Sequence, residues 1–392
     1  MSKVLVCRRA LLPHSETFIK QQILAYSRWE ALLMGTHHVA GVSLNGLATC
    51  MLYASEEGSS MPVKAYRKLL GQLDLAPRDA VRRLEAQRAS LIHVHFGTDA
   101  VAYWPFIRNL ELPIFITLHG YDIQIERSWW ESGGGGWLMR NYPQRLLALS
   151  RHPLVRFVAV SNAIRERAIE YGIPAEKITI VHIGIDCNEF VAGSLPVAER
   201  LPRVLFVGRL VEKKGCEYLI RAMKAVRSAM SGADLVVAGD GPLREPLKQL
   251  AKRLGVRATF LGSVTPSEVR TQLASARVFC LPSVRAANGD AEGFGLVLLE
   301  AQASGVPVVT SAVGGAQEGI LEGVTGYSFE EKDVASLSEK ISRLLTDDAL
   351  ASAMSLASPH FIRERFDIRR LTARLESLYD AEDHATMRTG LQ

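Results

Sequence analysis

The sequence lacks the features that mark membrane-spanning, disulfide-stabilised and zinc-binding proteins. None of its apolar runs reaches the roughly 18 to 20 residues that a membrane span needs. Its five cysteines are scattered and odd in number, and no Cys-x-x-Cys pair occurs, so neither a disulfide framework nor a zinc site is indicated. Reduced thiols of this kind fit a cytoplasmic protein.

A strong charge of either sign is also missing. A net charge of +5 on 392 residues is too diffuse to indicate nucleic-acid binding, although it permits contact with phosphate ligands or with the anionic inner face of the plasma membrane. The pattern of residues 1–8 predicts a buried first strand. It is not typical of a secretory signal, which would carry a longer apolar region and a cleavage site of small residues. The hydrophobic content of 48% describes a globular chain that is long enough for two domains.

The stretch 291–301 carries two carboxylates, Glu292 and Glu300, eight positions apart. A Gly-Phe-Gly turn follows the first, and a helix is expected from Phe294 onward. At ~1.5 Å of rise per helical residue this spacing covers roughly 12 Å. Two carboxylates that act on one bond lie roughly 5 to 9.5 Å apart, so this pair suits an extended ligand gripped at both ends. A nucleotide-sugar, with its diphosphate over the helix N-terminus, has this shape. The alternative is a surface helix with two unrelated glutamates.

Strand and helix patterns alternate through the chain in two successive series. They predict an α/β protein with two doubly wound, Rossmann-like domains that face a cleft. We expect an acceptor-binding domain over 1–188, a linker over 189–201 and a nucleotide-sugar-binding domain over 202–365. Residues 366–392 are expected to form a helix that crosses back to the first domain, followed by a tail.

The first strand of the second series ends at Gly208 and is followed by Arg209 and Lys214. A guanidinium can place two donors on phosphate oxygens, and an ammonium adds a point charge. The position at a strand tip favours phosphate binding over an ordinary surface pair. The turn 239–242 lacks the third glycine of a dinucleotide fingerprint and is only a weak signal. Because the phosphate-type elements concentrate in the second series, the donor is expected in that domain and the acceptor against the first.

Two strand ends of the first series are candidate ligand sites. His119 follows the strand 113–118, where it could hydrogen-bond a hydroxyl or stabilise developing charge; the alternative is a capping histidine. Ser15, Glu16 and Thr17 follow the first strand, with Ser15 expected to cap the next helix. They are acceptor-binding candidates, or else a plain helix start.

Two histidines and two longer segments leave more than one interpretation open. His93 and His95 share one face of a predicted strand and have no third ligand nearby, which favours strand or pocket histidines over a metal site. The segment 64–88 is basic, either as a solvated face or as a membrane contact. The segment 129–137 holds three tryptophans and four consecutive glycines. It is interpreted as a mobile loop near the acceptor or the membrane, or as a flexible loop without function.

Five motifs of the second half together resemble the retaining GT-B glycosyltransferases of family GT4. They are residues 206–215 (Phe-Val-Gly-Arg-Leu through Lys-Gly), 281–283, 292–295, 300–301 and 305–309. Within the family, residues 15–18, 95–97 and 117–122 look most like bacterial exopolysaccharide and colanic-acid-type members. The glycine-rich first loop common in the family is replaced here by residues 13–17.

The resemblance implies a role for each matched residue. Arg209 and Lys214 would neutralise the departing diphosphate, and Glu292 would orient the hydroxyls of the donor sugar without acting as a nucleophile. Glu300 would bind the ribose, and His119 would lie beside the reacting carbon. The backbone around sugar and phosphate would come from Gly208, Gly293, Phe294, Gly295 and Leu296.

The function that the resemblance implies is sugar transfer from a nucleotide-diphosphate sugar to a saccharide or lipid-linked acceptor. The anomeric configuration would be retained, and neither a cofactor nor a divalent metal would be needed. The product would belong to an exopolysaccharide or another cell-surface polysaccharide. Two other classes stay open, a sugar-nucleotide epimerase on the same fold and a non-catalytic sugar-binding protein.

Overall fold

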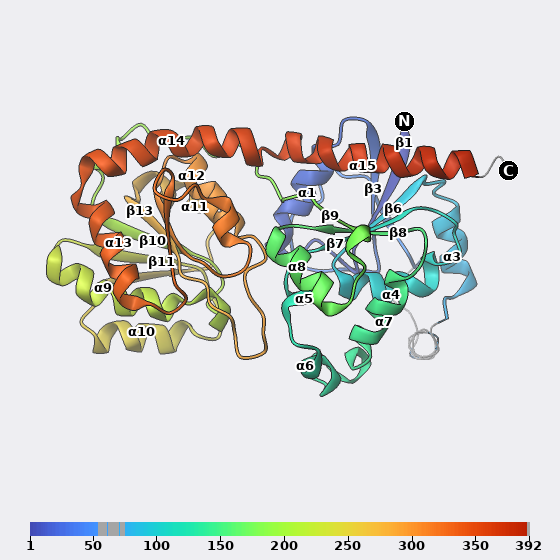
Figure 1. Ribbon diagram of the computed structural model, residues 1–392, viewed down its shortest axis with the longest axis horizontal. Helices are drawn as coiled ribbons and strands as arrows, with labels where there is room; N and C mark the ends of the chain where they lie inside the picture. The colour runs from blue at the N-terminus through green and yellow to red at the C-terminus, as the bar shows by residue number, and fades with distance from the viewer. Residues whose placement is uncertain (54–60, 62–69, 71–74, 390–392) are drawn as a thin grey trace. The chain divides into compact units, whose positions relative to one another are not determined.

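In the computed structural model the chain forms two compact units (Figure 1). The first contains Met1–Gly184 and Ile368–Gln392, and the second contains Ile185–Asp367. The structure describes every residue except 54–60, 62–69, 71–74 and 390–392. Much of the basic segment 64–88 therefore lies outside the described residues, and residues 189–201, expected as a linker, lie within the second unit.

The first unit is built on a parallel sheet in the order β5-β3-β1-β6-β7-β8-β9. Strands β6 and β7 are buried along their length, and β8 is buried at every position except Arg156. The strand order reverses between β1 and β6, which is where an open α/β sheet binds ligands at its carboxyl edge. The bounds are β1 Ser2–Cys7, β3 Trp29–Gly35, β5 Thr49–Met51, β6 Leu91–His95, β7 Ile114–Leu118, β8 Val155–Ala159 and β9 Ile178–Ile180.

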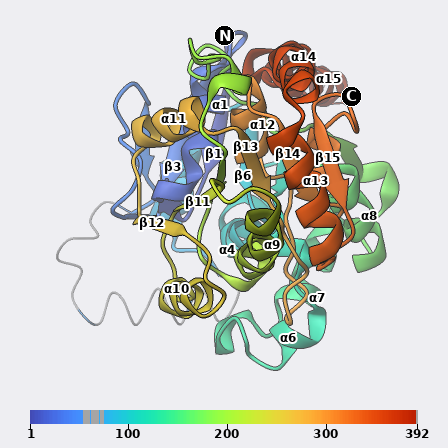
Figure 2. The same cartoon turned by 90° about the vertical axis from the view of Figure 1, so that its left-hand side faces the viewer.

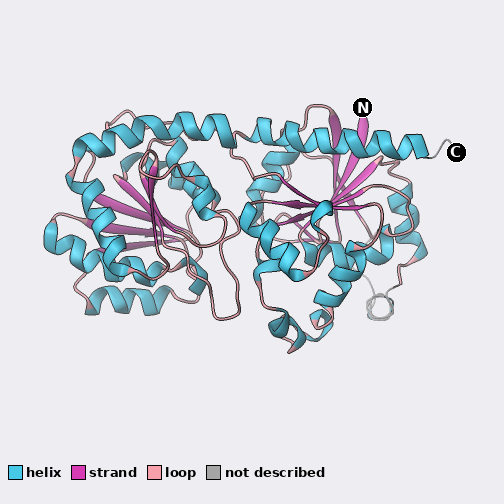
Figure 3. Cartoon of the chain, in the orientation of Figure 1, coloured by secondary structure: helices cyan, strands magenta, loops and turns pink. Residues whose placement is uncertain are grey.

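Helices cover both faces of this sheet (Figures 1 and 3). Helices α1 and α15 pack together on one face, while α3, α4 and α7 lie in a row on the other. Ser161 caps α8 by accepting from the backbone N–H of Ile164, as the sequence predicts. The bounds are α1 Thr17–Leu24, α3 Arg78–Glu85, α4 Gly97–Ile107, α5 Tyr121–Gln124, α6 Arg127–Glu131, α7 Tyr142–Ser150, α8 Asn162–Tyr171 and α15 Ile368–Thr389.

The C-terminal helix α15 is an integral part of the first unit. Its Tyr379 is fully buried in the core beside β6 and β7, where its hydroxyl contacts His93. The Glu376 carboxylate accepts hydrogen bonds from the backbone N–H groups of Ser27, Arg28 and Trp29, at 2.8, 2.6 and 3.1 Å. These contacts fix the turn that leads into β3.

The second unit has a parallel sheet in the order β12-β11-β10-β13-β14-β15. Helices α9, α10 and α13 cover one face, and α11, α12 and α14 cover the other (Figure 2). The predicted capping box of Thr265 and Glu268 is present at the start of α11. The bounds are β10 Arg203–Val207, β11 Asp234–Ala238, β12 Ala258–Gly262, β13 Val278–Leu281, β14 Val308–Ser311, β15 Gly326–Phe329, α9 Cys216–Ala229, α10 Arg244–Arg253, α11 Pro266–Ser275, α12 Leu296–Ala303, α13 Val334–Thr346 and α14 Asp348–Phe366.

The two sheets confirm the prediction of two doubly wound, Rossmann-like domains. In the second unit the strand order reverses between β10 and β13, so the loops after these two strands meet at the point where α/β sheets bind ligands. Among the described helices, none is both long enough and apolar enough to cross a membrane.

Candidate functional site

The loops after β10 and β13 bring two of the predicted site residues together. Lys214 Nζ donates to Glu292 Oε2 at 2.5 Å, and Ser283 Oγ lies 3.4 Å from the same oxygen. Burial raises the pKa of Glu292, but the charges of Lys214 and Lys213 outweigh it and leave the pKa below its usual value. The carboxylate is therefore ionised, and it holds the ammonium at the strand tip.

A second lysine beside this pair has its own partner. Lys213 Nζ donates to Asp290 Oδ1 at 3.0 Å. Two consecutive lysines thus bind two acids of the same loop, and they fix that loop against the end of β10.

Close backbone packing holds the strand-end loops in place. Gly215 has φ 62°, and a Cβ there would lie 1.8 Å from the carbonyl oxygen of Pro282. Gly314 has φ 64°, and a Cβ there would lie 2.1 Å from the carbonyl oxygen of Glu292. The N–H of Gly315 donates to that same oxygen at 3.1 Å. Glycine is needed at both positions because any side chain would push the loops apart.

Helix α12 begins at Leu296, two residues later than predicted. Gly295 precedes it with φ 82°, a left-handed conformation that ends the loop and cannot continue a right-handed helix. Gly293 and Phe294 belong to the buried loop that follows Glu292. No described side chain caps the helix, and the Leu298 N–H donates to the Gly295 carbonyl oxygen at 2.9 Å. The first two N–H groups of α12 are therefore the ones suited to an anion.

Glu300 lies in the middle of α12 and is half-buried. Burial, and then the charge of Glu189, raises the pKa of its carboxyl to about 7, while Arg270 opposes the shift. A carboxylate with a raised pKa gains from hydroxyl donors, which is the chemistry expected of a ribose ligand.

Arg209 and Gly208 follow β10 directly. The Arg209 side chain is exposed and makes no hydrogen bond or ion pair with the residues that the structure describes. Gly208 lies beside the aliphatic part of Lys214, since a Cβ on Gly208 would be 3.7 Å from the Lys214 Cδ and Cε. The guanidinium is therefore available to a ligand at the same strand tip as Lys214.

In the first unit, the loop after β7 is held by a buried carboxylate that sequence reasoning missed. Asp122 accepts from the backbone N–H groups of Gly97, His119 and Gly120 at 2.8, 3.1 and 2.9 Å. Its position three residues after His119 was the available signal. The bonds anchor His119 at the strand end, where its ring contacts Phe18 and Phe96.

The predicted acceptor residues follow a different local structure from the one expected. Residues His14–Glu16 form a 3-10 turn, and Glu16, not Ser15, precedes α1, without a side-chain cap. The prediction that Ser15 caps the helix is therefore wrong, because Ser15 lies inside this turn, which the Glu16 N–H closes by donating to the Pro13 carbonyl oxygen at 2.8 Å. Ser15 is exposed, and Thr17 is half-buried.

Glu16 is buried because it pairs with a cation at the end of β1. Arg8 donates to both of its carboxylate oxygens, at 2.9 and 2.5 Å, and also contacts the carboxylate of Asp99. The guanidinium carbon lies 4.4 Å from the Phe96 ring centre. Sequence reasoning missed Arg8, although a cation directly after the first strand was a visible signal.

The tryptophan-glycine segment packs on itself. A Cβ on Gly134 would lie 2.2 Å from the Trp129 ring, and one on Gly135 would lie 2.4 Å from the Trp130 ring. Trp130 is buried, whereas Trp137 and Leu138 at the next turn are 67% and 54% exposed. The glycines make room for two tryptophans and leave the third in solvent.

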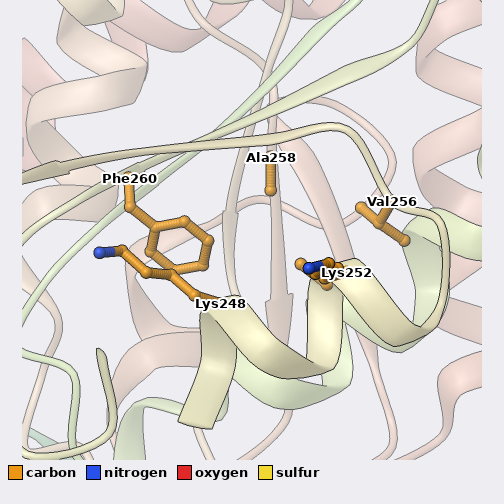
Figure 4. A pocket seen from close by; sticks show the side chains of 6 residues that line it. Lys248, Lys252, Val256, Ala258 and Phe260 are labelled. Atoms are coloured by element: carbon orange, nitrogen blue, oxygen red, sulfur yellow. The ribbon is translucent and has the colours of Figure 1, made fainter. Parts of the chain in front are cut away.

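A surface pocket of about 310 Å³ lies in the second unit between α10 and β12 (Figure 4). It is lined by Lys248, Ala251, Lys252, Val256, Ala258 and Phe260. None of the predicted site residues lines it, so it is separate from the strand tips described above. Among the described residues, no group of three or more His, Cys, Asp and Glu side chains could hold a metal ion.

Comparisons with known proteins identify the class. A family model described as "Glycosyl transferases group 1" matches residues 189–360, and one described as "Glycosyltransferase Family 4" matches residues 48–189. Together with the two parallel sheets, they define the chain as a GT-B protein. It belongs to the group 1, family 4 glycosyltransferases.

Individual relatives agree with this family. The chain is 34% identical to a GDP-mannose-dependent alpha-(1-6)-phosphatidylinositol monomannoside mannosyltransferase of Mycobacterium tuberculosis over 58% of this chain and 62% of that protein. It therefore spans about three fifths of that relative's length. It is 30% identical to the glycogen synthase of the same organism over 74% of this chain and 69% of that protein.

A solved structure shows the same fold. Anabaena Alr3699/HepE, solved in complex with UDP and glucose, is 20% identical to this chain. The comparison covers 97% of this chain and all of that one, with a TM-score of 0.78.

Proposed function

We propose that this protein transfers a sugar from a nucleotide-diphosphate sugar to a saccharide or lipid-linked acceptor with retention of configuration. The contact of Lys214 with Glu292, at the point where the strand order of the second unit reverses, carries the proposal. It joins a cation suited to a diphosphate with a carboxylate suited to sugar hydroxyls.

The other residues take roles that fit their surroundings. Arg209, exposed at the strand tip, adds a second cation for the departing diphosphate. The loop before α12 and the first turn of that helix bring backbone groups toward the phosphates. Glu300 accepts the ribose hydroxyls. For His119, a residue of the first unit, the role beside the reacting carbon is proposed from the motif resemblance alone.

No metal ion is required in this proposal. Two cations and a helix N-terminus supply positive charge to the departing diphosphate, which a divalent metal ion supplies in metal-dependent enzymes. Transfer should therefore proceed at an unchanged rate in the presence of EDTA.

The acceptor is proposed to belong to cell-surface polysaccharide synthesis, with exopolysaccharide the first candidate from the motif resemblance. A lipid-linked acceptor is supported by the mannosyltransferase relative, whose name includes a phosphatidylinositol glycoside. The exposed arginines of α3 and the exposed Trp137 and Leu138 suit peripheral contact with an anionic membrane on the cytoplasmic side.

Release of nucleoside diphosphate from UDP-, GDP- and ADP-sugars tests the function. We expect slow donor hydrolysis by the protein alone and faster release once a saccharide or lipid-linked acceptor is added. An epimerised donor formed without acceptor would identify an epimerase instead. Absence of turnover with every donor would leave a non-catalytic sugar-binding protein.

A further inference from the structure

Two histidines of the first unit share a hydrogen bond that leaves each with one unpartnered nitrogen. His95 Nδ1 lies 3.0 Å from His119 Nε2. The outer nitrogens, His95 Nε2 and His119 Nδ1, are both buried, and neither has a hydrogen-bond partner among the described residues. Buried polar atoms without partners are rare in folded proteins, so this pair requires a physical explanation.

A third histidine of the same cluster provides a contrast. His93 stacks on His95 with ring centres 4.5 Å apart, but both of its nitrogens have partners. Its Nδ1 contacts the Tyr379 hydroxyl, and its Nε2 lies 2.7 Å from Thr117 Oγ1. His93 is therefore explained by packing and hydrogen bonding within the core, whereas His95 and His119 are not.

The two rings of the pair differ in accessibility. His95 closes β6 and is 1% exposed, so a ligand does not reach it. His119 follows β7 at the carboxyl edge of the sheet and is half-buried. A ligand that binds at this edge can meet the ring of His119 alone.

Both rings are neutral. Burial lowers the pKa of His95, and the neighbouring His93, His119 and Arg8 lower it further. Burial also lowers the pKa of His119, and Arg8 and His93 add to the shift. The nearby acids do not reverse this, since Asp99 and Glu16 pair with Arg8 and Asp122 accepts from backbone N–H groups.

Two neutral rings carry two ring protons between them. One proton lies in the shared hydrogen bond, and the other lies on the outer nitrogen of the ring that accepts. The unpartnered N–H is therefore on His119 Nδ1 if His95 donates, and on His95 Nε2 if His119 donates. A buried N–H without a partner is less tolerated than a bare ring nitrogen, so its location matters.

We propose that His95 is a positioning residue, which donates from Nδ1 to His119 Nε2 and so holds His119 with its proton on Nδ1. This orientation places the unpartnered N–H on the half-buried ring at the carboxyl edge of the sheet. His119 Nδ1 is covered in the free protein, and a substrate oxygen accepts from it once the side chains over it move on binding. The opposite orientation would leave the N–H on His95 without access to ligand. The inference rests on the proposed sugar transfer and deepens it, because it makes His119 a neutral hydrogen-bond donor.

Long-range ¹H–¹⁵N correlation spectra of the histidine rings in the full chain test the tautomer directly. We expect protonated-type Nδ1 and bare-type Nε2 signals for His119 and also for His95, assigned with His119→Gln and His95→Asn. Protonated Nε2 in both rings would overturn the proposal, as would a doubly protonated ring. This readout does not depend on activity, so it separates the tautomer from the proposed function.

Kinetics of two His95 variants test the consequence for transfer. His95→Phe keeps a ring in the stack but removes the donor, whereas His95→Asn keeps an amide donor near the Nδ1 position. Removing a hydrogen-bond donor that stabilises developing charge lowers kcat by roughly 100- to 1,000-fold. His95→Phe leaves the His119 ring in place and removes only the group that fixes its tautomer, so we expect kcat to fall by roughly 10- to 100-fold, with a smaller change in KM. His95→Asn should recover most of this loss, and its His119 Nδ1 should remain protonated.

His93→Gln is the matched control, because it disturbs the same stack without touching His119. It should keep the His119 tautomer and kcat even where Tm falls. An active wild type with an unchanged kcat in His95→Phe, or an equal loss in the Asn and Phe variants, would overturn the positioning role. A wild type without transfer would contradict the proposed function and leave the tautomer result intact.

Discussion

Lys214 Nζ and Glu292 Oε2 lie 2.5 Å apart, although 78 positions of the chain separate the two residues. The contact joins the loop after β10 to the loop after β13, the two adjacent strands at which the strand order reverses. The ammonium is thus held in place before any ligand arrives. A fixed charge of this kind needs little reorganisation when a leaving group develops its own charge.

Replacing Lys214 by methionine should reduce turnover more than donor affinity. The charge that the ammonium meets grows in the transition state, so we expect kcat to fall by roughly 100-fold or more while Kd for the donor changes much less. Lys213→Met is the matched control, because it removes the neighbouring ammonium and its contact with Asp290 but leaves Lys214 in place. Single-turnover rates and donor titrations separate the two effects. Equal losses in kcat for the two variants would contradict the assigned role.

Glu300→Ala should weaken donor binding. A charge-assisted contact to the ribose hydroxyls is worth about 1.5 to 3 kcal/mol, which corresponds to a rise in Kd of roughly 10- to 100-fold. Calorimetric titration of the nucleoside diphosphate measures this change. An unchanged Kd would show that the ribose has another ligand.

The pH dependence of stability should reveal the raised pKa of Glu300, which is about 7 in the folded protein against an ordinary value of 4.5. Between these values the folded protein keeps a proton that the unfolded chain has lost. The contribution of this group to the free energy of unfolding therefore has its maximum below pH 4.5, and it decreases as the pH rises through 7. Urea unfolding of wild type and Glu300→Gln across this range tests the sign. The wild type should lose stability relative to the variant, and a relative gain would contradict the assignment.

Arg8→Met should destabilise the first unit. The substitution leaves the buried carboxylates of Glu16 and Asp99 without their guanidinium, and breaking a buried pair costs about 3 to 5 kcal/mol. Arg9→Met is the control, because the Arg9 side chain is exposed and its bond to Asp99 comes from the backbone. Denaturant unfolding compares the two. A similar small effect for both would mean that the carboxylates find other partners or become protonated.

Trp137 and Leu138 should contribute to membrane association. They are 67% and 54% exposed, and an exposed tryptophan favours the interface between lipid and water. The double variant Trp137→Ser with Leu138→Ser should bind phosphatidylglycerol vesicles several-fold more weakly than the wild type. Leu356→Ser in the second unit, which is 81% exposed, is the matched control. Equal binding by all three proteins in sedimentation would contradict this contact.

The sequence predicts the strands and their tips because these depend on local pattern. Apolar runs such as 203–207 and 114–118 became central strands, and the caps at Ser161 and Thr265 formed as expected. Knowing that parallel strands expose their carboxyl ends at one edge was enough to select Arg209, Lys214 and His119 as candidates. Glu292 was selected differently, from its spacing to Glu300 in the stretch 291–301.

Contacts between distant segments could not be predicted in the same way. The pairing of Arg8 with Asp99 spans 91 positions, and the burial of Tyr379 beside His93 spans 286. Each depends on how helices lie over the sheet, which no local pattern encodes. Ser15 was misassigned for a related reason, because the turn that includes Glu16 competes with a simple cap.

The most direct test of the account is whether a nucleoside diphosphate sugar stabilises this chain through Lys214 and Glu300. Thermal unfolding should be measured with UDP-, GDP- and ADP-sugars over a range of concentrations, since a bound ligand raises Tm by mass action. We predict that one nucleotide class raises the Tm of the wild type and that Glu300→Ala reduces the shift strongly, with a smaller reduction in Lys214→Met. A wild type whose Tm does not respond to any of the three classes, or an identical shift in both variants, would contradict the account.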